Sequence, residues 1–261
     1  MPDLVYERVQ TALARLKLTR ISAGLDGVAE EAARGAWSYV EFLDRLLEGE
    51  ISGRYEREVA MKTKLAHFPV VKTLDQFDFS FQPSVPEKQV RELATMRFVA
   101  HGENVLFLGP PGVGKTHLAI GLGMSAIAQS LSVYCVSIVE LLEQLARDQA
   151  EDRLGARLAA LCKPKVLILD EMGYFPLDRR AGQFLFQLVS RRYLKGSIIL
   201  TSNKSYGEWG DIFADQVLAA AVLDRLLHQS TTINIRGQSY RLREKRKAGV
   251  FGEAGETRPP A

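Results

Sequence analysis

One octapeptide constrains the fold of this chain more than any other feature of its sequence. It fits the pattern G-x-x-x-x-G-K-[ST] of phosphate-binding loops, and its residues are Gly109, Pro110, Pro111, Gly112, Val113, Gly114, Lys115 and Thr116. The apolar run before it predicts a buried strand over 104–108, and the pattern after it predicts a helix over 115–129. A strand, a glycine-rich loop and a helix in this order are the context that confirms the motif.

The residue types of the loop explain its chemistry. Glycines let the backbone turn without Cβ clashes, so successive N–H groups can point at a phosphate, and the following helix adds the positive end of its dipole. We expect Lys115 to reach the β- and γ-phosphates of ATP and the hydroxyl of Thr116 to hold Mg²⁺. His117, the next residue, is a further candidate for nucleotide binding.

Composition sets the class of protein but not its partners. The chain has 261 residues, of which 46% are hydrophobic, so it can form one large domain with a small appendage. A formal net charge of +3 permits a nucleic-acid partner without establishing one. Cys135 and Cys162 lack metal-type spacing, so we expect free thiols and a cytoplasmic protein. The uncharged stretch 118–139 begins inside the helix of the phosphate loop, and we do not expect it to span a membrane.

Patterning divides the chain into four predicted segments. Helical periodicity over 1–66 predicts a small helical N-terminal domain. The stretch 67–86 predicts an extended connector, and 87–250 forms the main domain around the phosphate loop. The Gly-, Glu- and Pro-rich residues 251–261 are predicted to be a disordered tail.

Two local signals refine the N-terminal domain. Ser38 and Glu41 form a predicted capping box that opens a helix. The Ser52-Gly53 pair predicts a turn that separates this helix from the next one.

Five apolar runs in the main domain predict strands, over 104–108, 132–136, 165–169, 197–201 and 230–235. Helical patterns separate them. Buried β-branched runs spaced by helices indicate a parallel sheet covered on both faces. The predicted fold class is therefore α/β, with a parallel five-stranded sheet flanked by helices and preceded by the small helical domain.

Two acidic residues, Asp170 and Glu171, follow the predicted strand 165–169. Ligands bind at the carboxyl ends of parallel strands, so we expect this pair beside the phosphate loop. Asp170 can hold Mg²⁺, and Glu171 can act as a general base on the attacking water. The alternative is an ordinary strand end with two solvated acids, which the alternating α/β pattern disfavours.

Two further polar residues are candidate catalytic groups. Asn203 follows the strand 197–201, and it would position the attacking water if this strand lies between the first strand and the acidic one; the alternative is a cap or turn residue. Arg225 lies on a predicted helix over 214–228 and could reach the γ-phosphate held by an adjacent subunit. The alternative for Arg225 is a pair with Asp224 or a surface charge.

The connector has an aromatic cluster, formed by Phe77, Phe79 and Phe81. The favoured interpretation is an extended segment that its rings pin to the main domain. The alternative is that one ring helps to form an adenine pocket.

The motifs together resemble a known group. The runs GPPGVGKTHLA, LILDEMG, TSNKSYGEW and AVLDRLLHQS resemble AAA+ ATPases of the helicase-loader and initiator group. The segments EFLDRLLEGEISGR and FPVVKTLDQFDF make the chain similar to the IstB family of transposition helper ATPases, over nearly its whole length.

The resemblance implies roles for the candidate residues. Asp170 and Glu171 correspond to the Walker B pair, Asn203 to sensor 1 and Arg225 to an arginine finger that acts on the next subunit. Arg241, in GQSYR, matches the sensor 2 arginine of loader-type proteins. We expect the chain to depart from the broader AAA+ pattern by lacking most of the C-terminal helical lid.

The resemblance also implies partners, namely duplex DNA bound with little sequence preference, the transposase of the same element and further copies of this chain. The candidate DNA contacts are Arg147, Arg153, Arg157, Arg54, Lys62 and Lys64. Phosphate contacts from such residues would weaken with salt, and solvated helix faces are the alternative.

The predicted function is an ATP-dependent regulator of transposition that assembles on DNA and recruits or stimulates a transposase. One alternative is a loader of a replicative helicase. Another is a nucleotide-switched DNA-binding scaffold with negligible hydrolysis. A small-molecule kinase is disfavoured because no phosphoacceptor site is evident.

Overall fold

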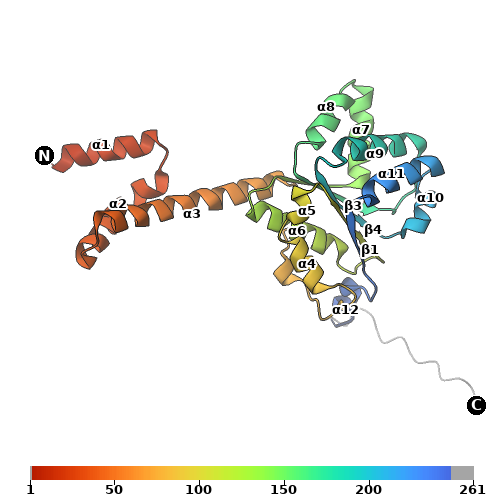
Figure 1. The fold of residues 1–261 in the computed structure, drawn as a ribbon, viewed down its shortest axis with the longest axis horizontal. Helices are drawn as coiled ribbons and strands as arrows, with labels where there is room; N and C mark the ends of the chain where they lie inside the picture. The colour runs from red at the N-terminus through yellow and green to blue at the C-terminus, as the bar shows by residue number, and fades with distance from the viewer. Residues whose placement is uncertain (1, 248–261) are drawn as a thin grey trace, which may run out of the picture. The chain divides into compact units, whose positions relative to one another are not determined.

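The computed structural model describes residues 2–247. They fall into two compact units, with the boundary between Met61 and Lys62. The predicted tail, 251–261, lies outside the described residues. The first unit contains α1 (Pro2–Arg15), α2 (Thr19–Gly35) and most of α3 (Tyr39–Leu65), which continues into the second unit (Figure 1).

The two local signals in the first unit have different outcomes. The capping box is confirmed, because the Ser38 N–H donates to the Glu41 carboxylate at 2.7 Å and the Glu41 N–H donates to the Ser38 hydroxyl at 3.3 Å. The predicted turn at Ser52-Gly53 is wrong, since α3 runs through it without a break. Gly53 is buried against α2, and a Cβ there would lie 2.6 Å from Cγ of Arg20. The glycine therefore permits a close helix contact rather than a chain reversal.

The second unit contains the predicted sheet. Its strands are β1 (Asn104–Leu108), β2 (Val133–Ser137), β3 (Val166–Met172), β4 (Ser197–Ser202) and β5 (Ser230–Asn234). They lie in the order β2-β3-β4-β1-β5, and every neighbouring pair is parallel. The parallel five-stranded sheet is thus confirmed, with β4 between β1 and β3.

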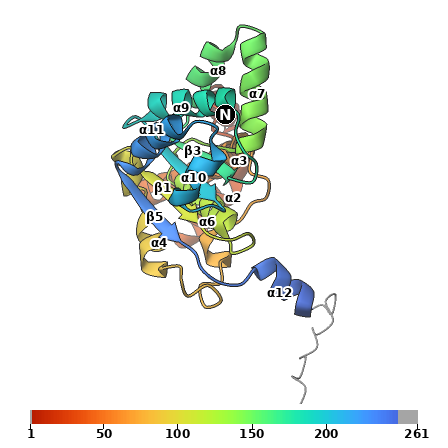
Figure 2. The same ribbon diagram turned by 90° about the vertical axis from the view of Figure 1, so that its right-hand side faces the viewer.

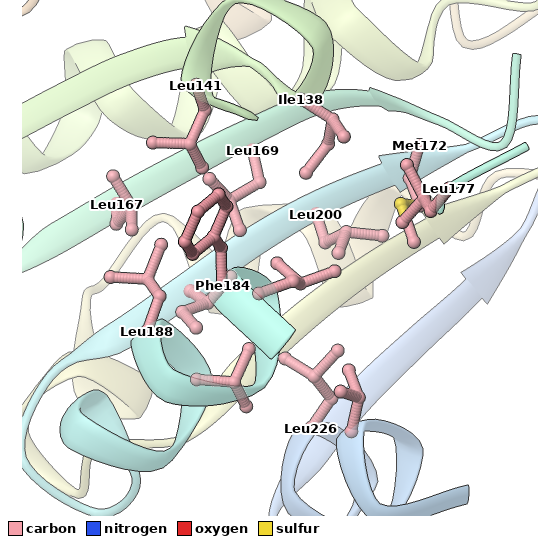
Figure 3. Packing of buried hydrophobic residues seen from close by; sticks show 14 of the residues in the cluster. Ile138, Leu141, Leu167, Leu169, Met172, Leu177, Phe184, Leu188, Leu200 and Leu226 are labelled. Carbon is pink, nitrogen blue, oxygen red and sulfur yellow. The ribbon is translucent and has the colours of Figure 1, made fainter. Parts of the chain in front are cut away.

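Helices cover both faces of this sheet (Figure 2). One face packs on α6 (Lys115–Ala128), and the other packs on α7 (Ile138–Ala150), α8 (Leu154–Leu161), α9 (Arg179–Arg192) and α11 (Gln216–Leu227). Alternate strand residues separate the two layers: Leu167 and Leu169 join the core under α7 and α9 (Figure 3), whereas Ile168 faces Gly123 of α6. The alternation continues to Asp170, which therefore lies on the α6 face.

Short elements complete the unit. The connector contains a 3₁₀ turn, η1 (Leu74–Gln76), and leads to α4 (Glu87–Leu93) and α5 (Arg97–Ala100). After β4 come η2 (Tyr206–Glu208) and α10 (Trp209–Ile212), and after β5 comes α12 (Tyr240–Lys247). Among the described residues, no helix has the length and apolar character to cross a bilayer, and both cysteines are free.

Candidate nucleotide site

The phosphate loop joins the end of β1 to the start of α6, which confirms the predicted strand, loop and helix. Its glycines occupy backbone conformations that other residues rarely adopt, with φ of +149° at Gly109, +81° at Gly112 and +100° at Gly114. A Cβ at Gly114 would lie 2.5 Å from Cε2 of Phe77. Glycine is therefore needed both for the turn and for the close approach of the connector.

Lys115 is buried at the first position of α6. Its Nζ donates to the carbonyl oxygens of Gly109 at 2.7 Å and Pro110 at 2.9 Å, so the ammonium lies over the loop. Burial lowers the pKa of Lys115 to about 8, a net shift that the charges of Asp170 and Glu171 oppose and the positive charge of Arg241 assists. These two contacts are with carbonyl oxygens, and a bound triphosphate would give the Lys115 ammonium a negatively charged partner.

The acid pair lies beside the loop, as the sequence predicts. The hydroxyl oxygen of Thr116 lies 2.9 Å and 3.0 Å from the two carboxylate oxygens of Asp170. This places one hydroxyl and one buried carboxylate together, the oxygen ligands that Mg²⁺ prefers. The two residues therefore fit a magnesium site, and a bound ion would neutralise charge on the phosphates.

Glu171 differs from Asp170 in exposure and backbone. Its side chain is exposed and lines the cavity beside the loop, while its own φ is +65°. A carboxylate at the wall of this cavity can accept a proton from a water that lies beside a bound phosphate. This position suits a general base.

The cavity has a volume of about 370 Å³ and is built from four parts of the second unit. They are the loop and the start of α6, the strand tips at Glu171 and Thr201, the connector, and the segment after β5, which contributes Tyr240 and Arg241. Of the connector phenylalanines, Phe77 and Phe81 line the cavity. The structure therefore makes the adenine-pocket alternative geometrically possible for both rings.

His117 links the cavity to the connector. Its Nε2 lies 2.9 Å from the carbonyl oxygen of Thr73, and its ring meets that of Phe77 edge-on with centroids 5.3 Å apart. Burial lowers the pKa of His117, which keeps the ring neutral at physiological pH. This residue packs the connector onto α6.

The segment after β5 closes over the same cavity. The Tyr240 N–H donates to the carbonyl of Gly112 at 3.0 Å. Arg243 stacks on Phe81, 4.5 Å from the ring centroid, and its Nη1 lies 3.7 Å from the Asp78 carboxylate. These contacts bring Arg241, the candidate sensor 2 arginine, to the cavity rim, and its contact with a nucleotide remains a prediction.

Asn203 and Arg225 are not among the residues that line the cavity. The Asn203 N–H donates to the carbonyl of Met172 at 3.3 Å, which joins the tips of β4 and β3. Among the described residues, its buried Oδ1 has no hydrogen-bond partner. Arg225 on α11 stacks over Phe186, with its guanidinium 4.5 Å from the ring centroid, and donates to the Ala221 carbonyl at 3.2 Å. Its role toward a second copy remains a prediction.

Most candidate DNA contacts have partners within the chain. Arg157 donates to the carboxylate of Asp148 at 2.6 Å, and Arg153 lies 3.8 Å from the same buried group, so both hold the corner between α7 and α8. Arg147 on α7 is exposed. In the N-terminal unit, Arg54 pairs with the buried Glu50 at 3.1 Å.

The two lysines near the end of α3 also differ from each other. Lys62 donates to the carbonyl of Ser130, whereas Lys64 is exposed. All six DNA contacts remain predictions, and Arg54, Lys64, Arg147 and Arg153 are exposed.

The sequence did not predict several residues that line the cavity, among them Gln82, Tyr174, Thr201 and Tyr240. Thr201 and Tyr240 line it but belong to no phosphate-binding motif. The signal that could have identified Thr201 is its polarity, because it is a polar residue one position before the end of a strand and lies on the α6 face of the sheet. Nothing local marks Tyr240, because the return of the chain after β5 brings it there.

Together, the parallel sheet, the phosphate loop and the acid pair define a P-loop nucleotide-binding protein with an AAA+ core. The model of the family "IstB-like ATP binding protein" matches residues 11–248. This chain therefore belongs to the IstB-like ATP-binding family.

Two relatives support the assignment across almost the whole chain. A protein of Pseudomonas aeruginosa, named for an ATP-binding role in insertion sequence IS21, is 50% identical over 243 residues, which cover 93% of this chain and 92% of the relative. A protein of Geobacillus stearothermophilus, named likewise for IS5376, is 50% identical over 240 residues, which cover 92% and 96%.

Solved structures show the same fold. The DnaC helicase loader superposes with a TM-score of 0.50 at 22% identity, covering 57% of this chain and 88% of the loader. The initiator DnaA bound to AMPPCP and single-stranded DNA gives 0.56 at 18% identity, covering 72% and 58%. At these identities the similarity shows the fold alone.

Proposed function

We propose that this chain is an ATP-hydrolysing regulator of DNA transposition. In its ATP-bound form it assembles on duplex DNA and recruits or stimulates the transposase of the same element. The proposal is supported by the convergence of Lys115, Thr116 and Glu171 at one cavity, with the Asp170 carboxylate 2.9 Å from the Thr116 hydroxyl, in a chain of the IstB-like family. The names of its relatives, which refer to insertion sequences, supply the transposition context.

The chemistry follows from the positions of the side chains. The loop N–H groups and Lys115 bind the phosphates, and Thr116 and Asp170 hold Mg²⁺. Glu171 accepts a proton from a water that Asn203 helps to orient, and the water attacks the γ-phosphorus. ADP and phosphate then leave, and the proton on Glu171 passes to solvent through its exposed carboxyl group.

Arg225 completes the site from an adjacent copy. Its stacking on Phe186 holds the guanidinium on α11 within its own chain. A positive charge brought to the γ-phosphate only after assembly would make hydrolysis depend on oligomerisation. ATP binding therefore favours assembly, and hydrolysis releases it.

Mixing two inactive variants tests this assignment. Arg225→Ala keeps the base but lacks the finger, and Glu171→Gln keeps the finger but lacks the base. In an equimolar mixture with DNA, we expect some ATPase activity to return, because some interfaces combine an intact base with an intact finger. Activity that stays at the level of the separate variants would overturn the trans role of Arg225.

DNA binding is tested by fluorescence anisotropy with duplexes of unrelated sequence. We expect ATP-dependent binding that differs little between sequences and weakens steeply with salt, because phosphate contacts release counterions. Lys115→Ala is the matched control, since loss of nucleotide binding should remove the ATP-dependent part. Equal affinity at low and high salt would contradict this part of the proposal.

The two alternatives give different results in the same assays. A helicase loader would stimulate a replicative helicase and leave transposase activity unchanged. A scaffold would bind DNA with ATP without measurable turnover. The IstB-like family match over residues 11–248 favours the transposition role.

A further inference from the structure

A threonine that no phosphate-binding motif assigns lies between the two acids. Thr201 is on β4, 1% exposed, and points to the α6 face of the sheet. Its hydroxyl accepts a hydrogen bond from the Glu171 N–H at 3.0 Å and donates to Oδ1 of Asp170. One hydroxyl has one hydrogen and two lone pairs, so it can make both contacts at once.

The reason lies in the pairing of β3 with β4. Leu169 pairs with Leu200, but the next pair is Met172 with Ser202, so Asp170 and Glu171 together face Thr201 alone. Such a bulge places one extra residue in a strand and leaves its backbone groups without ladder partners. Here the N–H of the extra residue, Glu171, is bound by the side chain of Thr201 instead.

The backbone of Glu171 needs this support. Its φ of +65° lies in the left-handed region, which a residue other than glycine keeps only where the surrounding structure holds it. The same bulge turns the Glu171 carboxylate toward the cavity while the Asp170 carboxylate stays buried beside Thr116. The direction of the base thus depends on the bulge.

We propose that Thr201 is a positioning residue that holds the bulge at Asp170 and Glu171 and so aims the general base at the attacking water. The inference rests on the proposed function, because it takes Glu171 as the base. Thr201 need not touch the reacting atoms. Its removal should therefore slow turnover while nucleotide binding persists.

Four variants test this. Thr201→Val removes the hydroxyl at nearly constant shape, and Thr201→Ser keeps it. Ile199→Val trims a buried side chain on the same face of β4 and controls for lost packing. Glu171→Gln tests the base itself. Should Thr201→Val be recovered unfolded, Thr201→Ala carries the same expectation.

We expect Thr201→Val to lower kcat by about 10- to 100-fold, because a small misplacement of a catalytic group has effects of this size. The KM for ATP and the affinity for a non-hydrolysable analogue with Mg²⁺ should change by less than about threefold. Thr201→Ser should recover most of kcat. The amide of Glu171 should exchange with solvent deuterium faster in Thr201→Val than in the wild type or in Thr201→Ser.

The inference is overturned if Thr201→Val keeps its kcat, if its amide exchange is unchanged, or if Ile199→Val loses as much kcat at an equal fall in Tm. If Glu171→Gln is inactive while Thr201→Val is active, only the role of Thr201 fails. If Glu171→Gln hydrolyses ATP at the wild-type rate, the assignment of the base fails, and hydrogen exchange alone then decides whether Thr201 holds the bulge.

Discussion

The phosphate loop and the tip of β3 lie beside the same cavity, and both hold backbone in conformations with positive φ. The loop does so with glycine, at Gly109, Gly112 and Gly114. The tip of β3 does so with Glu171, whose N–H is bound by the buried hydroxyl of Thr201. One site avoids strain through its residue type, and the other keeps a strained residue in place through a tertiary contact.

The difference follows from what each region does. The loop presents backbone N–H groups to phosphate, so it needs no side chain at its turning points. The tip of β3 must present a carboxylate, which glycine cannot supply. A catalytic side chain at a left-handed position therefore requires a partner elsewhere in the fold, and Thr201 lies 30 residues farther along the chain.

The largest expected effect is on kcat, and it tests whether the tip of β3 serves hydrolysis while the phosphate loop serves ATP binding. Glu171→Gln should lower kcat by about 100- to 10,000-fold, because a general base is lost, while ATP affinity is retained. Steady-state hydrolysis and binding of a fluorescent ATP analogue measure the two quantities. Glu92→Gln, an exposed change on α4, is the control. Turnover at the wild-type rate in Glu171→Gln would show that the tip of β3 does not supply the general base.

Gly114→Ala tests the loop. A Cβ there meets Phe77 at 2.5 Å, and φ is +100°, so we expect a loss of about 2–3 kcal/mol in unfolding free energy and weaker ATP binding. Urea unfolding and ligand titration measure the change. Gly155→Ala on α8 has open space around its Cβ, so it should be neutral or stabilising by up to about 1 kcal/mol. Equal effects at both positions would contradict the argument.

The pKa of Lys115, about 8, predicts how pH acts on the loop. Phosphate binding favours the protonated form, so ATP affinity should fall by about tenfold between pH 7 and pH 9. The unfolding free energy of the nucleotide-free protein should change in the opposite direction. Burial penalises the charged form of Lys115, so the folded protein should gain stability as pH rises from 8 toward the pKa of Lys115 in the unfolded state. His117 is neutral across this range and does not contribute. ATP affinity that is flat from pH 7 to pH 9 would exclude this assignment.

The smallest expected effect is a difference in unfolding free energy that reports the backbone strain at Glu171. With φ at +65°, Glu171→Gly should be more stable than Glu171→Ala by about 1 kcal/mol. At Gln183, an exposed helical position on α9, the same comparison should have the opposite sign, because glycine disfavours helix by about 1 kcal/mol relative to alanine. Urea unfolding of the four variants measures both differences. If the alanine variant is the more stable one at both positions, the backbone of Glu171 is not strained.

Much of the site was predictable from local pattern. Apolar runs marked all five strands, the loop motif marked Lys115 and Thr116, and the strand-end rule placed Asp170 and Glu171 beside them. The main error, a turn at Ser52-Gly53, arose because glycine signals both a turn and a close helix contact, and only the approach of Arg20 distinguishes them. The order of the strands could be stated only as a condition on Asn203, and the sheet satisfies it.

The sequence by itself determined the parallel α/β core and the chemistry of the phosphate loop, because both depend on residue type and spacing along short stretches. Only the tertiary structure decided that the connector packs Phe77 against Gly114, that the segment after β5 brings Arg241 to the cavity, and that Thr201 meets Glu171. The physical reason is that a bulge depends on the register between two strands, and register is set by packing across the whole sheet.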